Sequence, residues 1–245
     1  MLSSSRSSLL IAALMVALSL SGVLALDRLG RAARSFGVCG PLASQAVSKV
    51  RVAQSVEAYR LWRARHYRGR TVLFLGANWP KVQPDGFIEP PAAREYPLKL
   101  DNYVATLEAQ FLDSTTFLFM ATQTGVARRI IAVLPETGFR NMMEGTRKAK
   151  HVELHNGYLL VPYMGYPRFF ATLKDLVDPG EPVLVYLAAD FFQECSAQQL
   201  YTRLKEASVA SDQVVLCDQA GEATVSEAAR RELDRFAQLI GAGGR

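Results

Sequence analysis

Short, continuous apolar runs recur along the chain between turn-forming residues. The clearest of them span residues 71–75, 129–134, 182–188 and 213–217. Strands that are apolar on both faces occur in sheets covered by helices, and such sheets are mostly parallel. These four runs therefore predict the buried central strands of an α/β domain.

Two pairs of apolar runs predict β-hairpins. Residues 115–122 and 129–134 are separated by a turn signal ending in Gly125, which indicates a hairpin or, alternatively, two separate strands. Residues 151–154 and 158–164 flank an Asn-Gly pair. Asn-Gly between apolar runs is the strongest short-range hairpin signal, so we expect a well-defined register there.

Apolar side chains at helical spacing predict helices over residues 41–67, 139–150 and 168–177. Two more helices are predicted from the capping-box spacing, in which Ser or Thr precedes Gln or Glu by three positions. The two pairs are Ser196 with Gln199 and Thr224 with Glu227. Gly241 is expected to end the last helix, because glycine readily adopts the conformation that closes a helix.

The region after the first predicted strand is rich in proline. Five prolines lie between Trp79 and Pro97, and proline lacks the backbone donor that a helix requires. This segment is therefore predicted to be extended and irregular. Irregular segments of this length are either functional or disordered.

Alternating strands and helices predict an α/β fold, with a three-layer sandwich around a mostly parallel sheet that has mixed edges. We expect a single domain of this kind over residues 68–245. Residues 26–67 form a basic leading segment that is predicted to be helical.

The amino terminus has the pattern of a targeting segment. A polar start containing Arg6 precedes an apolar stretch, and small residues end it at Ala25, which is the order found in secretory signal peptides. The stretch from residue 7 to residue 26 holds 20 uncharged residues, enough to cross a bilayer without cleavage. Residues 1–25 are thus expected to be a signal peptide or a signal anchor.

Charge is distributed unevenly along the chain. The net charge is +5, and the first 56 residues carry the whole surplus, with six basic residues and one acid. The remainder is balanced, so the basic character does not indicate a nucleic-acid partner. We expect a membrane-anchored or secreted, extracytoplasmic protein. In the alternative, a bipartite leader with a second targeting segment after residue 25 directs the chain to an organelle.

Polar residues follow four of the predicted strands, where ligands gather in open α/β sheets. They are Asn78, Glu136, Asp190 and Asp218. Asp190 and Asp218 follow neighbouring predicted strands, and two adjacent carboxylates can bind a hard cation or share a proton. In the alternative, these acids cap helices or face water. Asn78, Asp190 and Asp218 are the candidate ligand-binding residues, and nothing else in the sequence completes a metal site.

A cysteine and a histidine form the best catalytic candidate. His155 follows one predicted strand, and Cys195 follows another and precedes a helix, whose positive end lowers the pKa of a thiol. This order resembles caspase-type and legumain-type peptidases, and the resemblance implies that Cys195 is the nucleophile and His155 the base. The chain departs from that pattern at Asn156, which separates His155 from Gly157, and in lacking a Gly-containing motif after the nucleophile.

Other motifs give no support for a cofactor. Gly76-Ala77-Asn78 has neither the Rossmann glycine spacing nor the Lys of a phosphate loop, and the G-x-S-x-G, H-E-x-x-H and C-x-x-C patterns do not occur. Cys217 is expected to be a small buried hydrophobic residue. A disulfide between Cys39 and Cys195 cannot be derived from the sequence.

These observations lead to two hypotheses about function. The first is a membrane-delivered or exported α/β domain that acts as a non-catalytic subunit or binding module of a larger assembly, with a protein partner. The second is a hydrolase or transferase on a Rossmann-like sheet that uses Cys195 with His155 or the carboxylates Asp190 and Asp218. The sequence does not decide whether the protein is an enzyme.

Overall fold

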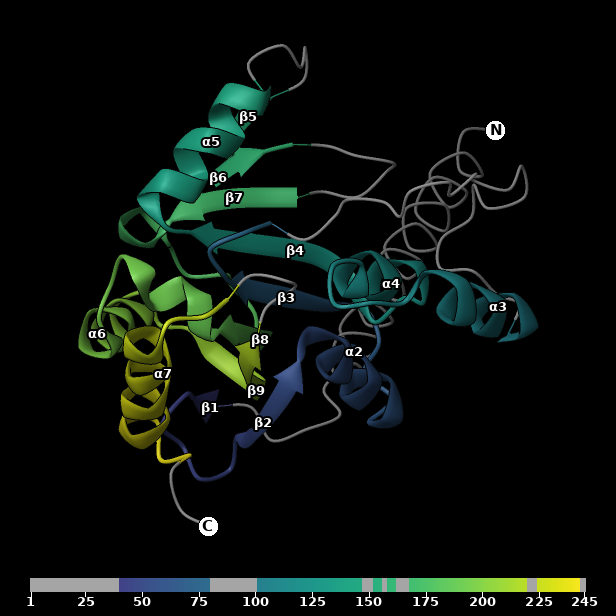
Figure 1. Ribbon diagram of the computed structural model, residues 1–245, viewed down its shortest axis with the longest axis horizontal. Helices are drawn as coiled ribbons and strands as arrows, with labels where there is room; N and C mark the ends of the chain where they lie inside the picture. The colour runs from purple at the N-terminus through teal and green to yellow at the C-terminus, as the bar shows by residue number, and fades with distance from the viewer. Residues whose placement is uncertain are drawn as a thin grey trace, which may run out of the picture. The chain divides into compact units, whose positions relative to one another are not determined.

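A nine-stranded mixed β-sheet organises the chain (Figure 1). The structure is a computed structural model, and it describes residues 40–79, 101–146, 152–155, 158–161, 168–219 and 224–242. The strands are β1 (Gly40–Pro41), β2 (Ser48–Gln54), β3 (Arg70–Leu75), β4 (Ala127–Leu134), β5 (Glu153–His155), β6 (Tyr158–Leu160), β7 (Arg168–Thr172), β8 (Val183–Ala188) and β9 (Ala210–Gln219).

The strands are ordered β1-β9-β8-β3-β4-β7-β6-β5, and β2 also pairs with β9. All the pairings among β2, β9, β8, β3, β4 and β7 are parallel, whereas β1, β5 and β6 are antiparallel to their neighbours. The predicted α/β class and the mostly parallel sheet with mixed edges are confirmed.

Six α-helices and two short 3₁₀ helices occur among the described residues. The α-helices are α2 (Ser55–Ala64), α3 (Asp101–Phe111), α4 (Phe117–Gln123), α5 (Glu136–Thr146), α6 (Ala197–Glu206) and α7 (Glu227–Leu239). The 3₁₀ helices are η1 (Leu173–Asp175), after β7, and η2 (Ala189–Gln193), after β8.

The buried apolar side chains form two clusters. Leu73 and Leu75 of β3 belong to one cluster with residues of α6 and α7. Val72 and Phe74 belong to the other with residues of α2 and α4. Successive side chains of a strand point to opposite faces, so the sheet buries apolar surface on both faces. This explains why its central strands are apolar throughout.

The order of the strands reverses direction between β3 and β8. From β3 the chain proceeds outward to β4 and β7, and then returns to the other side of β3 to form β8 and β9. After β3 the chain leads to α4, which packs in one cluster, and after β8 it leads to α6, which packs in the other. The carboxyl ends of β3 and β8 therefore flank the switch point at which α/β sheets bind ligands.

Several local patterns predicted their structures correctly. The hairpin around the Asn-Gly pair is present, with Glu153 of β5 opposite Leu160 of β6. Ser196 and Gln199 form the expected capping box of α6, with both reciprocal hydrogen bonds. Gly241 ends α7 with a φ of +73°, and the next amide, of Ala242, donates to the carbonyl of Ala237 at 2.7 Å.

The predicted hairpin over residues 115–122 and 129–134 is wrong. Residues 117–123 form α4, and β4 pairs in parallel with β3. Every residue of α4 is buried, so its sequence shows no amphipathic period. A short, uniformly apolar run does not distinguish a buried helix from a buried strand.

The predicted helix over residues 168–177 is also wrong, because residues 168–172 form β7 beside β4. Phe169 packs against one core cluster and Phe170 belongs to the other. That alternation is the period of a strand. Only the 3₁₀ turn η1 follows it.

The predicted helix over residues 41–67 is correct only for its second half. Residues 48–54 form β2, and α2 begins at Ser55. Val50 and Val52 face the same core cluster while Arg51 is exposed, so a period of two was present in this segment. Residues 40–67 therefore contribute to the same sheet as the rest of the chain.

Two helices begin at other residues than the sequence predicts. The final helix is capped by Ser226 rather than Thr224, because the Ser226 hydroxyl accepts from the amide of Ala229 at 3.2 Å. The helix predicted over residues 139–150 is present as α5, which begins at Glu136. The predicted proline-rich loop, from residue 80 onward, and the predicted leader over residues 1–25 lie outside the described residues.

Candidate functional site

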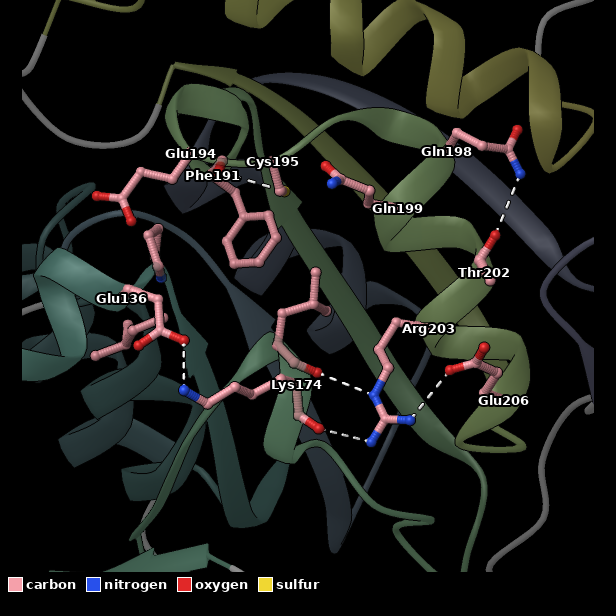
Figure 2. A pocket seen from close by; sticks show the side chains of 13 residues that line it. Glu136, Lys174, Phe191, Glu194, Cys195, Gln198, Gln199, Thr202, Arg203 and Glu206 are labelled. Atoms are coloured by element: carbon pink, nitrogen blue, oxygen red, sulfur yellow. Dashed lines mark hydrogen bonds and ion pairs between the residues drawn. The ribbon is translucent and has the colours of Figure 1, made fainter.

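A cavity of about 480 Å³ lies at the carboxyl edge of the sheet, between η1 and α6 (Figure 2). Its apolar lining includes Leu134 at the end of β4, Leu173 after β7 and Phe191 after β8. Polar and charged side chains complete the lining, among them Glu136, Lys174, Glu194, Gln198, Gln199, Thr202, Arg203 and Glu206. We call this cavity the edge groove.

Arg203 fixes the position of α6 relative to η1. Its guanidinium donates to the carbonyl oxygens of Lys174 at 2.8 Å and Leu173 at 3.2 Å (Figure 2). It also donates to the carbonyl oxygen of Leu176 at 2.7 Å. It also forms an ion pair with Glu206 at 3.2 Å. Because these carbonyls and Glu206 occupy four of its five N–H donors, Arg203 mainly holds α6 against the segment that contains η1.

A second ion pair crosses the mouth of the groove. Lys174 lies 3.0 Å from Glu136, and both side chains are largely exposed. The hydrogen bond with Glu136 raises the pKa of Lys174. Exposed pairs of this kind stabilise a protein very little. Glu136, predicted at the end of a strand, thus contributes to the rim of the groove.

Cys195 also lines the edge groove, but its thiol is not activated. Burial, together with the nearby carboxylates of Glu232 and Glu194, raises its pKa to about 12. The thiolate is the nucleophilic form of cysteine. At neutral pH Cys195 is therefore protonated and unreactive, contrary to the expectation that the following helix would lower its pKa.

The structure does not bring His155 to Cys195. His155 lies in β5, at the far end of the sheet, and β5 is separated from β8 by five strand positions. With about 4.8 Å between neighbouring strands, this corresponds to roughly 24 Å. A base and a nucleophile must lie within hydrogen-bonding distance. With their strands this far apart, His155 and Cys195 are not brought into hydrogen-bonding contact.

Asp190 lies at the switch point, directly after β8, and its side chain is buried. Oδ1 accepts a hydrogen bond from the amide of Ala77, after β3, at 3.2 Å. Oδ2 is buried and has no hydrogen-bond partner among the residues that the structure describes. Burial raises the pKa of Asp190 to about 6, and hydrogen bonds from backbone amides offset only part of that effect.

Asp218 has a different environment. Its carboxylate pairs with Arg51 of β2 at 2.5 Å, and Arg51 also reaches Asp234 of α7 at 2.5 Å. Asp218 and Asp190 therefore do not form a carboxylate pair that shares a proton. Asn78 is exposed, one residue beyond the amide that binds Asp190. Within the described residues, no group of three or more His, Cys, Asp and Glu side chains is arranged to hold a metal ion.

Sequence reasoning found the ends of the strands but not the groove. Gln198, Thr202 and Arg203 line it from α6, and none of them was a candidate. The sequence holds no signal for their role, because the exposed face of a helix lines a cavity only when another element lies opposite. Comparison with known proteins gives no match, either to a family model, to a curated protein or to a solved structure.

Proposed function

We propose that the protein is a non-catalytic subunit or binding module, and that its edge groove binds a segment of a partner protein. The observation that carries the proposal is the groove itself, a cavity of about 480 Å³ at the carboxyl edge of the sheet. Cavities of this size and position are typical of binding sites in α/β proteins.

The composition of the groove supports a protein partner. An apolar centre is surrounded by neutral polar side chains, including Gln198 and Thr202, while its charged residues Lys174 and Arg203 are ion-paired within the chain. An apolar centre with a polar rim is the usual anatomy of a protein interface. The groove thus suits a partner segment that inserts an apolar side chain.

The state of the candidate catalytic residues supports a non-catalytic role. The Cys195 thiol is held in its unreactive form, and the Asp218 carboxylate is paired with Arg51. His155 lies five strand positions from β8. None of the arrangements required by the hydrolase or transferase hypothesis is assembled among the described residues.

Delivery to a membrane or export remains part of the proposal, and it rests on the signal-like segment over residues 1–25. A bipartite leader directed to an organelle is the alternative. No helix within the described residues is long and apolar enough to cross a membrane. We also propose that the two core clusters correspond to helical layers on either face of the sheet, as in a three-layer sandwich.

The test compares two variants of the full-length chain that carry the same substitution at different sites. Gln198→Arg places a bulky charge at the groove, and Gln238→Arg places it on the exposed surface of α7. We expect native mass spectrometry of the protein purified from its own cells to show a complex for the wild type and for Gln238→Arg. Gln198→Arg should lose the complex. A monomer in all three samples, or a complex that survives Gln198→Arg, contradicts the proposal.

A further inference from the structure

Among the described residues, the side chain of Asp190 is linked to the turn after β3 by one hydrogen bond, which Oδ1 accepts from the amide of Ala77 at 3.2 Å. It joins the turn after β3 to η2, the segment after β8, across the switch point. Only 1% of Asp190 is exposed. The carboxylate that accepts this bond is therefore shielded from water, although Ala77 is partly exposed, and the strength of the bond depends on the charge of the carboxyl group.

Two further contacts connect this joint to the edge groove. The carbonyl oxygen of Ala77 lies so close to Gly138 of α5 that a Cβ added there would be 2.7 Å from it. The amide of Thr137 donates to Glu194, which lines the groove, at 3.3 Å. The turn after β3, the start of α5 and the end of η2 thus form one connected unit at the carboxyl edge.

The ionisable groups on neighbouring elements do not compensate the charge of Asp190. Tyr186 of β8 and Cys217 of β9 are neutral at physiological pH, because burial raises the pKa of each. The acids on β9 and α7 are already paired, Asp218 and Asp234 with Arg51 and Glu232 with Arg235. No described basic side chain forms an ion pair with Asp190, whose Oδ2 has no partner.

We propose that Asp190 is a proton-operated latch, which holds the turn after β3 against η2 tightly when ionised and loosely when protonated. In the ionised state Oδ1 accepts a charge-assisted hydrogen bond from the Ala77 amide. In the protonated state the proton adds to Oδ2, which has no donor, and the bond at Oδ1 becomes a neutral one. Charge-assisted hydrogen bonds are roughly twice as strong as neutral ones.

The pKa of about 6 places the change within the range of pH that cellular compartments reach. Acidification should affect the whole fold and the Asp190–Ala77 bond in opposite ways. Acidification removes a buried, uncompensated charge and so stabilises the folded chain as a whole, but it weakens the local bond between Asp190 and Ala77. Global stability and local protection at Ala77 should therefore move in opposite directions. The latch goes beyond the proposed binding function, and its test needs no partner.

The test follows the backbone amide of Ala77 by NMR in the full-length chain as the pH is varied. We expect the amide resonance to titrate with a midpoint of about 6. Its hydrogen-exchange protection factor, corrected for the intrinsic rate, should fall about fivefold from the ionised to the protonated form. In Asp190→Asn the titration should vanish. In the matched variant Asp218→Asn, on the neighbouring strand, it should remain.

A second measurement keeps the proposal testable if Asp190→Asn does not fold. The side-chain carboxyl ¹³C resonance of Asp190 in the wild-type chain should titrate with the same midpoint as the Ala77 amide. A carboxyl midpoint near the ordinary value of 3.8 would overturn the latch. So would an Ala77 amide that does not respond when the carboxyl titrates, or one that responds equally in Asp190→Asn.

Discussion

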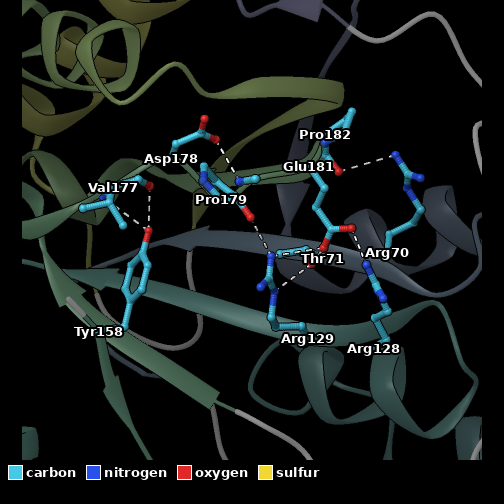
Figure 3. Close-up of polar contacts among 11 residues, drawn as sticks. Arg70, Thr71, Arg128, Arg129, Tyr158, Val177, Asp178, Pro179, Glu181 and Pro182 are labelled. Carbon is cyan, nitrogen blue, oxygen red and sulfur yellow. Dashed lines mark hydrogen bonds and ion pairs between the residues drawn. The ribbon is translucent and has the colours of Figure 1, made fainter. Parts of the chain in front are cut away.

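At the amino edge of the sheet Glu181 binds two arginines, whereas at the carboxyl edge Asp190 binds none of the described basic side chains. Arg129 lies 3.1 Å from Glu181, Arg128 pairs with the other carboxylate oxygen, and the Thr71 hydroxyl donates a hydrogen bond (Figure 3). Arg129 also donates to the carbonyl of Pro179 at 2.9 Å. The loop that leads into β8 is therefore attached to the starts of β3 and β4.

The two carboxyl groups respond to burial in opposite ways. Burial raises the pKa of both, but at Glu181 the hydrogen bond from Thr71 and the charges of Arg128 and Arg129 outweigh it, so the pKa lies below its usual range. At Asp190 nothing outweighs it, and the pKa rises to about 6. The amino edge is thus arranged for stability. At the carboxyl edge, the buried Asp190 with its raised pKa directly precedes Phe191, which lines the edge groove, and perturbed pKa values are typical of functional sites.

The largest expected effect comes from the most buried ion pair of the amino edge. Arg70 and Asp212 pair at the starts of β3 and β9, with side-chain exposures of 10% and 1%. Removing one partner of a buried pair leaves the other charge uncompensated and costs about 3–5 kcal/mol. We expect Arg70→Met to lower the free energy of unfolding in urea by that amount. A loss below about 1 kcal/mol would show that the pair does not stabilise this edge.

Substitution at the carboxyl edge should have the opposite sign. Moving the pKa of Asp190 from 3.8 to about 6 costs roughly 3 kcal/mol when the group is ionised. Burying an asparagine amide without all its partners instead costs about 1–3 kcal/mol. Asp190→Asn should therefore stabilise the chain by up to about 2 kcal/mol at about pH 8, as measured by urea unfolding.

The stabilisation expected for Asp190→Asn should depend on pH, and this dependence is the control for its cause. Between 3.8 and about 6 the folded chain keeps a proton that the unfolded chain has lost, so the stability of the wild type falls as pH rises through this window. The advantage of Asp190→Asn should grow across the window and remain constant above it. A variant that is less stable at every pH would contradict the contrast between the edges.

Glu181→Gln should destabilise the chain by about 1.5 kcal/mol at neutral pH, because hydrogen bonds to a charged group are lost. Its pKa is lower in the folded chain than the ordinary 4.5. The contribution of Glu181 is therefore present above that value and disappears as pH falls through the folded pKa. Urea unfolding over acidic pH should show wild type and variant converging. A constant difference would mean that the carboxylate charge is not responsible.

The smallest effect is expected for Arg51→Met. Arg51 bridges Asp218 and Asp234, but all three side chains are more than one third exposed. Exposed ion pairs contribute about 0–1 kcal/mol, and salt screens them. The loss of unfolding free energy should be under about 1 kcal/mol and should shrink in concentrated salt. A loss of unfolding free energy as large as that of Arg70→Met would contradict the expectation that the exposed Arg51 pairs stabilise the chain less than the buried Arg70–Asp212 pair.

Parts of the fold could be predicted because the signal was local. The capping box of Ser196 and Gln199 was correct, because its hydrogen bonds join residues three positions apart. The hairpin of β5 and β6 depended on a two-residue turn signal. The buried strands β3, β8 and β9 were found from their apolar runs. In each case the interacting residues, or the period that defines them, lay within one short segment.

The prediction failed where the environment of a segment decided its structure. Residues 117–123 form a helix because they pack on the face of the sheet on which Phe74 lies. Residues 168–172 form a strand because they pair with β4. Similarly, Asp190 and Asp218 looked alike in the sequence, each following an apolar strand. Arg51, 167 positions away, neutralises Asp218, and within the part of the chain that the structure describes no basic side chain pairs with Asp190.

The sequence by itself determined the class of the fold, its central strands and the concentration of positive charge at the amino terminus. Only the tertiary structure decided which strands are neighbours, which carboxylates are paired and where the cavity lies. The reason is physical: periodicity and capping depend on contacts within a few residues, whereas burial and ion pairing depend on groups brought together from distant parts of the chain.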